Sequence, residues 1–251
     1  MQPAAGLKNI PRKKLLLPKA KAIFSGNFPH CLFMEKHIYL ISGMGADERI
    51  FNNLIFPEGY IPHYLEWLTP GTEESYTDYA ARMAARIEHE NISLLGVSFG
   101  GMLSLEIARQ RPVNKTILIS SIKHTNEKPY YLNFVRRTGL LRLLDLPDAV
   151  IFKNRGMIIR YFLHAETPEE KQLLTDYLNK TSYNYLRWSI RQVVNWQNDF
   201  LPEGLVHIHG GKDMSFPIRF VRPDYTIPTG GHLMVLNRAA EINEILKKEL
   251  P

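Results

Sequence analysis

The 251-residue sequence is poor in cysteine, in long apolar runs and, near its start, in acidic residues. Its single cysteine, Cys31, excludes an intrachain disulfide and a cysteine-rich metal site, and a cytoplasmic protein is the simplest expectation. No apolar run approaches the roughly 20 residues that a membrane-spanning helix requires. The apolar content of 45% and charged content of 22% are typical of a globular protein, so we expect a folded chain without a membrane span.

No acidic residue precedes Glu35, so the net charge of +6 has a local origin. The rest of the chain carries 25 basic and 25 acidic residues, which argues against a nucleic-acid partner. We expect residues 1–33 to be a disordered or spurious N-terminal extension, with a targeting peptide as the alternative, and Met34 to begin a domain over 34–251. The basic residues that account for the whole excess are Lys8, Arg12, Lys13, Lys14, Lys19 and Lys21.

Short apolar segments alternate with helical patterns from residue 36 onward, which is typical of a parallel sheet with helical crossovers. The predicted fold class is therefore α/β, with a mostly parallel sheet of about six strands flanked by helices. Helices are expected from near Glu48, over 75–90, directly after residue 98 and over 239–249. Strands are expected at 37–42, 60–67, 92–97, 115–120, 205–209 and 224–227.

Between residues 123 and 198 the strand pattern gives way to a helical one. Thr167 can cap one of these helices, with Pro168 in the first turn and Glu170 completing a capping box. The block contains 12 basic and 7 acidic residues, a net charge of +5 within a formally neutral body. We expect most of its aromatic side chains to hold the helices to the body and a few to line an apolar pocket. The candidate helices are 129–145, 149–164, 168–180 and 182–197.

The segment Gly96-Val97-Ser98-Phe99-Gly100 lies between an apolar strand pattern and an amphipathic helical pattern. In a sharp strand-to-helix turn of this kind the serine has a positive φ, and Gly96 and Gly100 leave room for the crossing backbones. The Ser98 hydroxyl is then exposed at the top of the sheet, and the Phe99 amide lies at a helix N-terminus, where it can face a developing negative charge. The pattern favours a nucleophilic serine. The alternative is a serine that only caps the helix.

Two further residues can supply the base and the acid that a serine nucleophile needs. Asp213 lies in the turn after the strand at 205–209, and His232 lies in the loop after the strand at 224–227. Because parallel strands present their C-terminal ends at one edge of the sheet, we expect Ser98, Asp213 and His232 to meet there. The alternatives are a purely structural histidine and an aspartate that only forms a turn.

Other polar residues near these strands are weaker candidates for the acid of the triad or for metal ligands. Asp199 and Asp224 are fallback acids, but neither follows a strand end in the right place. His207 and His209 alternate on one strand face, as a pair of metal ligands can. No third ligand with suitable spacing accompanies them, so no metal site is expected.

From about residue 36 to the C-terminus the chain resembles the α/β-hydrolase superfamily. The resemblance implies a helical cap over the active site at about 123–198 and an oxyanion hole made by the backbone amides of Phe99 and Met44. Many relatives have His-Gly in the loop after the first strand, where this chain has Ser42-Gly43, and many have two strands before it. The matching segments are Gly96-Val97-Ser98-Phe99-Gly100-Gly101, His209-Gly210-Gly211-Lys212-Asp213-Met214-Ser215-Phe216-Pro217 and Gly231-His232.

The resemblance implies a serine hydrolase that cleaves a carboxylic ester or thioester through an acyl-enzyme on Ser98, without a cofactor. The positive charge of the block at 123–198 can steer an anionic substrate, such as a CoA thioester or an acyl chain on an acidic carrier protein. One alternative is a lyase or carbon–carbon hydrolase with the same triad, as in menaquinone-pathway relatives. The other is a non-catalytic small-molecule binding protein on the same fold.

Overall fold

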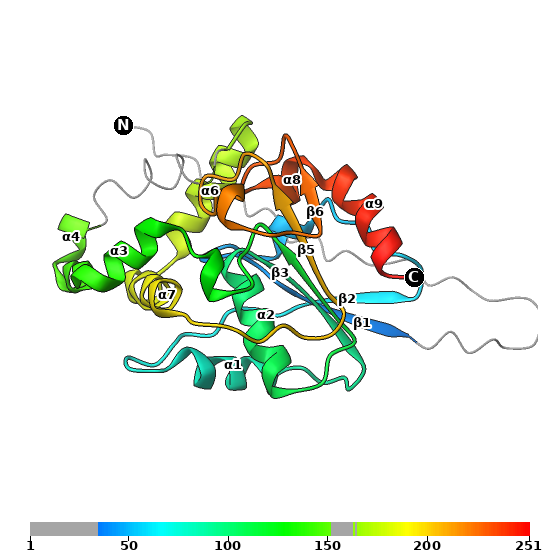
Figure 1. Ribbon diagram of the computed structural model, residues 1–251, viewed down its shortest axis with the longest axis horizontal. Coiled ribbons are helices and arrows are strands. Elements are labelled where there is room, and N and C mark those ends of the chain that lie inside the picture. Colours follow the sequence, from blue (N-terminus) through cyan, green and yellow to red (C-terminus); the bar gives the residue numbers. More distant parts are fainter. Residues whose placement is uncertain (1–34, 152–162, 164) are drawn as a thin grey trace, which may run out of the picture. The chain divides into compact units, whose positions relative to one another are not determined.

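Six parallel strands form one sheet, with the order β2-β1-β3-β4-β5-β6 (Figure 1). The computed structural model describes residues 35–151, 163 and 165–251. The predicted six-stranded parallel sheet is confirmed, whereas the predictions for residues 1–33 and for most of the helix at 149–164 lie outside the described residues. The strands are β1 (Lys36–Ile41), β2 (Tyr60–Tyr64), β3 (Ile92–Val97), β4 (Lys115–Ile119), β5 (Leu205–Gly210) and β6 (Tyr225–Ile227).

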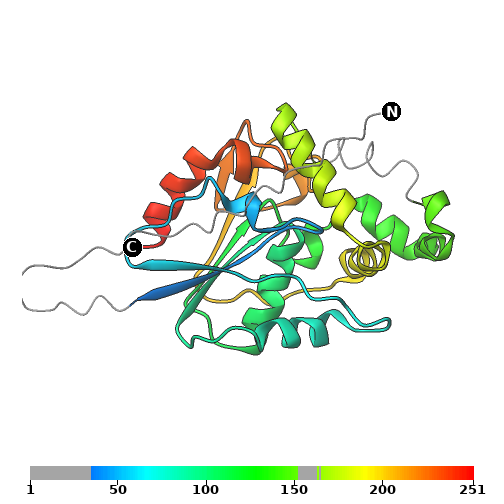
Figure 2. The same cartoon turned by 180° about the vertical axis from the view of Figure 1, so that it is seen from behind.

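Helices cover both faces of the sheet, as Figures 1 and 2 show from opposite sides. In β1, Tyr39 and Ile41 pack in one hydrophobic cluster, whereas Ile38 and Leu40 pack in the other, because successive strand side chains point to opposite faces. Burial of both faces explains why the strands read as continuous apolar runs rather than as alternating ones. One face carries α1 (Tyr76–Ala84) and α2 (Phe99–Gln110), and the other carries η1 (Glu48–Phe51), α8 (Met234–Asn237) and α9 (Ala239–Glu249).

Side-chain caps start several of the helices as the sequence predicts. The Ser75 hydroxyl accepts a hydrogen bond from the backbone amide of Asp78 at the start of α1. Asp47 accepts one from the Arg49 amide at the start of η1, which is a short 3-10 helix. Thr167 and Glu170 form the predicted capping box. These local bonds satisfy amides that have no partner within the first helical turn.

The segment between β4 and β5 is helical in its described part. The predicted single helix over 129–145 is wrong, because Gly139 adopts a left-handed conformation (φ 72°) that ends α3 before a 3-10 helix begins. No helix in the described part of the chain is long and apolar enough to cross a membrane. The elements are η2 (Thr125–Glu127), α3 (Tyr130–Thr138), η3 (Leu140–Asp145), α4 (Asp148–Ile151), α6 (Pro168–Lys180) and α7 (Tyr183–Asn195).

The first long helix is shorter than predicted, since α1 ends at Ala84 rather than near residue 90. The Arg111 guanidinium donates hydrogen bonds to the carbonyls of Ala84, Ile87 and His89. These bonds satisfy carbonyls that a longer helix would have paired along its own axis, so the chain can turn directly into β3. Arg111 is remote in sequence from α1, so local patterns could not have located this end.

Candidate active site

Ser98 lies between β3 and α2 with φ 54° and ψ −119°, a conformation that costs about 1–3 kcal/mol for a residue other than glycine. The turn is tight enough to require both flanking glycines. A Cβ on Gly96 would lie 2.4 Å from the Gly100 carbonyl oxygen, and one on Gly100 would lie 2.3 Å from the carbonyl oxygens of Ile41 and Ser42. The Ser98 side chain makes no capping hydrogen bond. A serine that only caps the helix is therefore the wrong description of this turn.

The structure brings Ser98, His232 and Asp213 together in one hydrogen-bonded chain. His232 Nε2 lies 2.8 Å from Ser98 Oγ, and His232 Nδ1 lies 2.8 Å from Asp213 Oδ2. The two distances fit a tautomer in which Nδ1–H donates to the carboxylate and Nε2 accepts from the serine hydroxyl. His232 is 4% exposed and Asp213 is 3% exposed, so water has little access to the His232–Asp213 pair.

Backbone amides hold the carboxylate of Asp213 in place. Its Oδ1 accepts hydrogen bonds from the amides of Ser215 and Phe216, each at 2.8 Å, which leaves Oδ2 for His232. Burial raises the pKa of Asp213, but the charge and hydrogen bond of His232 and the Phe216 amide outweigh it, so the pKa falls below its ordinary value. Asp213 is therefore ionised at neutral pH and can stabilise a positive charge on the imidazole.

The loops that carry the acid and the base are joined by backbone hydrogen bonds. The Gly211 amide donates to the Ile227 carbonyl at 2.9 Å, and the Lys212 amide donates to the Gly230 carbonyl at 2.8 Å. His209, considered above as a metal ligand, has its Nε2 2.7 Å from the Phe216 carbonyl oxygen. Burial lowers the pKa of His209, and a neutral ring that donates to this carbonyl supports the same turn.

The two fallback acids lie elsewhere. Asp224 Oδ2 accepts the backbone amide of His207, and Asp199 lies 3.8 Å from Arg109 with its side chain 90% exposed. Neither carboxylate is the hydrogen-bond partner of His232. Asp213 is thus the acid that the structure pairs with this histidine.

A buried hydroxyl braces the loop that follows β1. Ser42 Oγ donates to the Ala46 carbonyl at 2.8 Å, accepts the Trp67 indole N–H at 2.9 Å, and lies 3.1 Å from the Tyr64 hydroxyl. Gly43 lies directly beside the nucleophile turn, since a Cβ on it would be 3.6 Å from Ser98 Cβ. The loop is therefore fixed next to Ser98 by the hydroxyl of Ser42.

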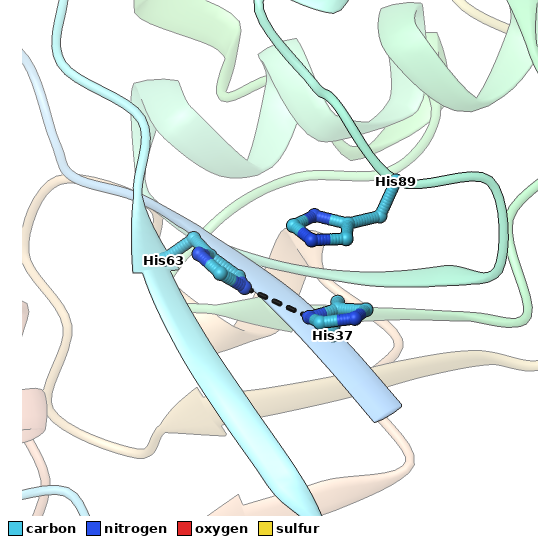
Figure 3. Close-up of side chains that lie close together, drawn as sticks. All are labelled: His37, His63 and His89. Carbon is cyan, nitrogen blue, oxygen red and sulfur yellow. Dashed lines mark hydrogen bonds between the residues drawn. The ribbon is translucent and has the colours of Figure 1, made fainter. Parts of the chain in front are cut away.

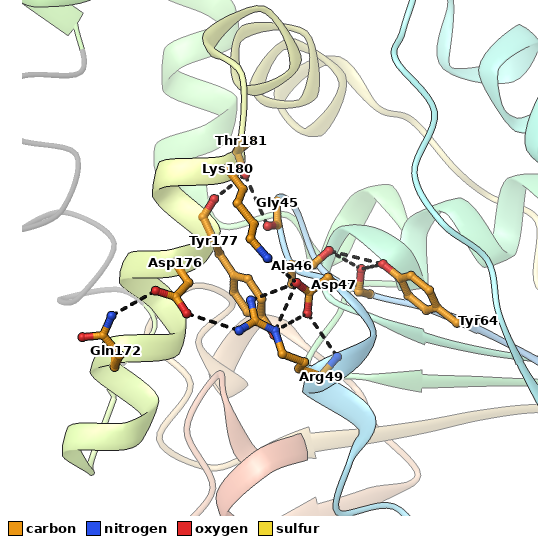
Figure 4. A network of polar contacts seen from close by, with 11 residues as sticks. Gly45, Ala46, Asp47, Arg49, Tyr64, Gln172, Asp176, Tyr177, Lys180 and Thr181 are labelled. Carbon is orange, nitrogen blue, oxygen red and sulfur yellow. Dashed lines mark hydrogen bonds and ion pairs between the residues drawn. The ribbon is translucent and has the colours of Figure 1, made fainter. Parts of the chain in front are cut away.

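An ion-pair network joins this loop to helix α6 (Figure 4). The Arg49 guanidinium bridges Asp47 at 2.8 Å and Asp176 at 3.2 Å, and Lys180 lies 3.7 Å from Asp47. The Thr181 hydroxyl donates to the Gly45 carbonyl at 3.3 Å. This network was not predicted, because its members on the two sides are more than 100 residues apart in the chain.

Aromatic rings surround the start of α2. The Phe99 ring stacks against Trp67 with centroids 5.3 Å apart and against Tyr76 at 5.1 Å. Trp188, from α7, meets Phe99 edge-on at 6.1 Å. This contact ties the helical segment between β4 and β5 to the residue that follows Ser98. The expected role of the segment's aromatic residues in holding it to the body fits Trp188, which is 5% exposed, and also Tyr130, whose ring meets that of Phe220 edge-on at 4.8 Å although the Tyr130 residue is 77% exposed.

A second polar cluster was not predicted from the sequence. His37, His63 and His89 come together away from Ser98, and each can offer one nitrogen to a shared ion (Figure 3). His37 and His63 are 26 residues apart, so they do not form a short metal-binding motif that can be recognised in the sequence. Only the pairing of β1 with β2 and the path of the chain after α1 could have revealed the cluster.

Comparison with known proteins gives structural neighbours only, since no family model and no curated protein matches the sequence. An esterase from Exiguobacterium antarcticum superposes with a TM-score of 0.63 at 19% identity, over 85% of this chain and 91% of that one. The hydrolase olei00960 from Oleispira antarctica gives 0.66 at 12% identity, over 85% and 90%. A bromoperoxidase from Bacillus anthracis gives 0.59 at 17% identity, over 86% and 91%. With the parallel sheet and the turn at Ser98, these likenesses show that the chain has the α/β-hydrolase fold.

Proposed function

We propose that this protein is a serine hydrolase that cleaves a carboxylic ester or thioester. The observation that carries the proposal is the hydrogen-bonded chain from Ser98 through His232 to Asp213, at the C-terminal edge of a parallel sheet. The structural neighbours include esterases from Exiguobacterium antarcticum and Nitrososphaera gargenis, which is consistent with the proposal. At such low identity they support the fold, so the chemistry rests on the three side chains.

In the proposed reaction His232 Nε2 takes the proton of the Ser98 hydroxyl as the oxygen attacks the substrate carbonyl carbon. Ionised Asp213 stabilises the imidazolium that forms and keeps the ring in the required orientation. The proton then passes from Nε2 to the leaving alcohol or thiol, and the acyl group remains on Ser98. Water, activated by the same histidine, attacks the acyl-enzyme and releases the acid.

The negative oxygen of each tetrahedral intermediate needs hydrogen-bond donors. We assign this role to the backbone amides of Phe99 and Met44. Phe99 opens α2, where amides have no helical partner and the helix dipole favours an anion. Met44 lies in the loop that Ser42 braces, one residue beyond the glycine next to Ser98. Removal of one such donor typically costs about 10²–10³ in kcat.

The substrate is proposed to carry an apolar acyl part and an anionic remainder. The half-buried ring of Trp67, which stacks on Phe99, offers apolar contact, and the segment from 123 to 198 has an excess of five positive charges. A CoA thioester or an acyl chain on an acidic carrier protein fits both features. Raised salt is then expected to lower kcat/KM for a CoA thioester but hardly for a neutral ester, because screening removes long-range attraction. Equal salt effects on the two substrates would contradict an anionic preference.

Hydrolysis of p-nitrophenyl esters and acyl-CoA thioesters by the wild type and by Ser98→Ala tests the proposed function. The wild type is expected to release product from at least one substrate of the panel. Ser98→Ala should lose that activity by a factor of at least about 10⁴ while it retains its melting temperature. Product analysis that found cleavage of a carbon–carbon bond or an elimination, and no ester or thioester cleavage, would favour the lyase alternative instead.

A further inference from the structure

Three imidazoles lie close together in Figure 3. They gather toward the end of the sheet where β1 and β3 begin, whereas Ser98 follows the end of β3. His37 is the second residue of β1, His63 lies in β2, and His89 lies in the connection from α1 to β3. The parallel register sets Tyr39 opposite His63, which brings His37 and His63 close together. His37 Nδ1 lies 2.9 Å from His63 Nε2, and the ring of His89 stacks on that of His37 with centroids 3.5 Å apart.

The nitrogens of this cluster are close to the spacing that a metal ion requires. One nitrogen from each ring can be chosen so that all three lie within 4.8 Å of one another. A tetrahedral Zn²⁺ with bonds of about 2.1 Å needs nitrogens about 3.4 Å apart. The His37–His63 pair must therefore open slightly while the His89 nitrogen approaches. The ring planes of His37 and His89 are only 19° apart. Both rings must therefore also tilt, by rotation of their side chains, before they can point a nitrogen at the same ion.

A hydrogen bond from Tyr39 orients the ring of His89 for metal binding. The Tyr39 hydroxyl lies 2.8 Å from His89 Nδ1 and accepts the Glu88 backbone amide at 3.1 Å. With Nδ1 engaged, Nε2 is the nitrogen that His89 can offer to an ion. Metal-binding histidines commonly use their second ring nitrogen in this way, and the bond fixes the tautomer and the orientation of the ring. Tyr39 is 5% exposed, so it is itself well held.

Solvent reaches the cluster through a cavity of about 780 Å³. Of the three histidines, His37 and His89 line it. Its charged lining consists of the carboxylate-bearing residues Glu35, Glu90 and Glu249 and of Lys36 and Lys115. The cavity gives an ion a path of entry and leaves room for water or a carboxylate as a fourth ligand. Its wall is formed at the beginnings of β1 and β3, whereas Ser98 follows the end of β3, so this cavity is distinct from the candidate active site.

We propose that His37, His63 and His89 form a binding site for a divalent transition-metal ion, with Zn²⁺ as the probe of choice. Three imidazoles without a thiolate suit Zn²⁺, Ni²⁺ and Cu²⁺, whereas Mg²⁺ and Ca²⁺ prefer oxygen ligands. The ion would join β1, β2 and the connection after α1, three segments far apart in the chain. Its expected effect is to stabilise the fold, since it lies at the other edge of the sheet from the triad.

Isothermal titration of the untagged, metal-free full-length chain with ZnCl₂ tests the site. The wild type is expected to bind one Zn²⁺ per chain. His63→Gln and His89→Gln should each weaken that binding at least about tenfold, because loss of a residue that only hydrogen-bonds to a metal ligand already costs that much. His124→Gln is the matched control. His124 lies at the start of η2, where its Nδ1 accepts the Asn126 amide, so its loss should leave Zn²⁺ affinity unchanged.

Two further readouts separate ligation from a purely structural role of the rings. Zn²⁺ should raise the melting temperature of the wild type and of His124→Gln but not of His63→Gln or His89→Gln. Co²⁺ in place of Zn²⁺ should give the wild type an intense visible absorption that both cluster variants lack. Mg²⁺ should have neither effect. The proposal is overturned if the wild type binds no Zn²⁺, or if binding is as strong in folded His63→Gln and His89→Gln as in the control, since the imidazoles would then only stack and share hydrogen bonds.

Discussion

The hydroxyl of Ser42 offers the sharpest test of how the proposed oxyanion loop is held. Ser42→Ala removes a group with 0% exposure that donates to the Ala46 carbonyl and accepts the Trp67 indole N–H. Each such bond contributes about 0.5–1.5 kcal/mol net. Because Ala46 and Trp67 are half-buried and water can partly replace the hydroxyl, we expect a loss of about 2 kcal/mol in the free energy of unfolding.

The same change should affect catalysis. Without its brace the loop can move the Met44 amide away from the developing oxyanion, which we expect to lower kcat about tenfold to a hundredfold with little change in KM. Urea unfolding and steady-state ester hydrolysis measure the two effects. Ser120→Ala is the matched control, because the Ser120 hydroxyl is equally buried but has no hydrogen-bond partner among the described residues. If Ser42→Ala behaved like Ser120→Ala in both assays, the reasoning about the loop would be refuted.

Two further predictions concern the nucleophile turn and the acid. Gly100→Ala should destabilise the fold by about 3 kcal/mol in urea unfolding, because its Cβ would lie 2.3 Å from two backbone oxygens, and an unchanged midpoint would contradict this packing. The folded-state pKa of Asp213 is depressed, so its ionised form stabilises the fold above the unfolded pKa of about 3.9, and this stability is lost as pH falls through the folded value. Asp213→Asn should therefore weaken the fall in stability between about pH 5 and 3, and equal slopes would show that Asp213 contributes nothing.

The sequence predicted the sheet well because its strands are buried on both faces and read as short apolar runs between turns. The helix over 239–249 and the capping box at Thr167 were also predicted as they occur, since both depend on local pattern. The predictions that were wrong concern helix ends, which depend on contacts with residues remote in sequence or on the conformation of a single residue. Arg111 ends α1 from another helix's C-terminus, and Gly139 divides a continuous apolar pattern by adopting a positive φ.

The candidate site followed from topology as much as from motifs. Ser98, Asp213 and His232 each come shortly after a parallel strand, so their meeting could be expected before any geometry was known. The bracing by Ser42 could not, because its partners Tyr64 and Trp67 are set by the path of the chain after β2. The histidine cluster could not be predicted from the sequence either, since His37, His63 and His89 share no local pattern.

Intact mass after treatment with a fluorophosphonate probe tests the central claim most directly. The wild type should gain one adduct, Ser98→Ala should gain none, and His232→Ala should react much more slowly because no base remains to take the serine proton. Ser104→Ala serves as a control, since the hydroxyl of Ser104 donates a hydrogen bond to the Gly100 carbonyl within α2. A folded wild-type protein that gains no adduct, or an adduct that persists in Ser98→Ala, would contradict an activated serine at this turn.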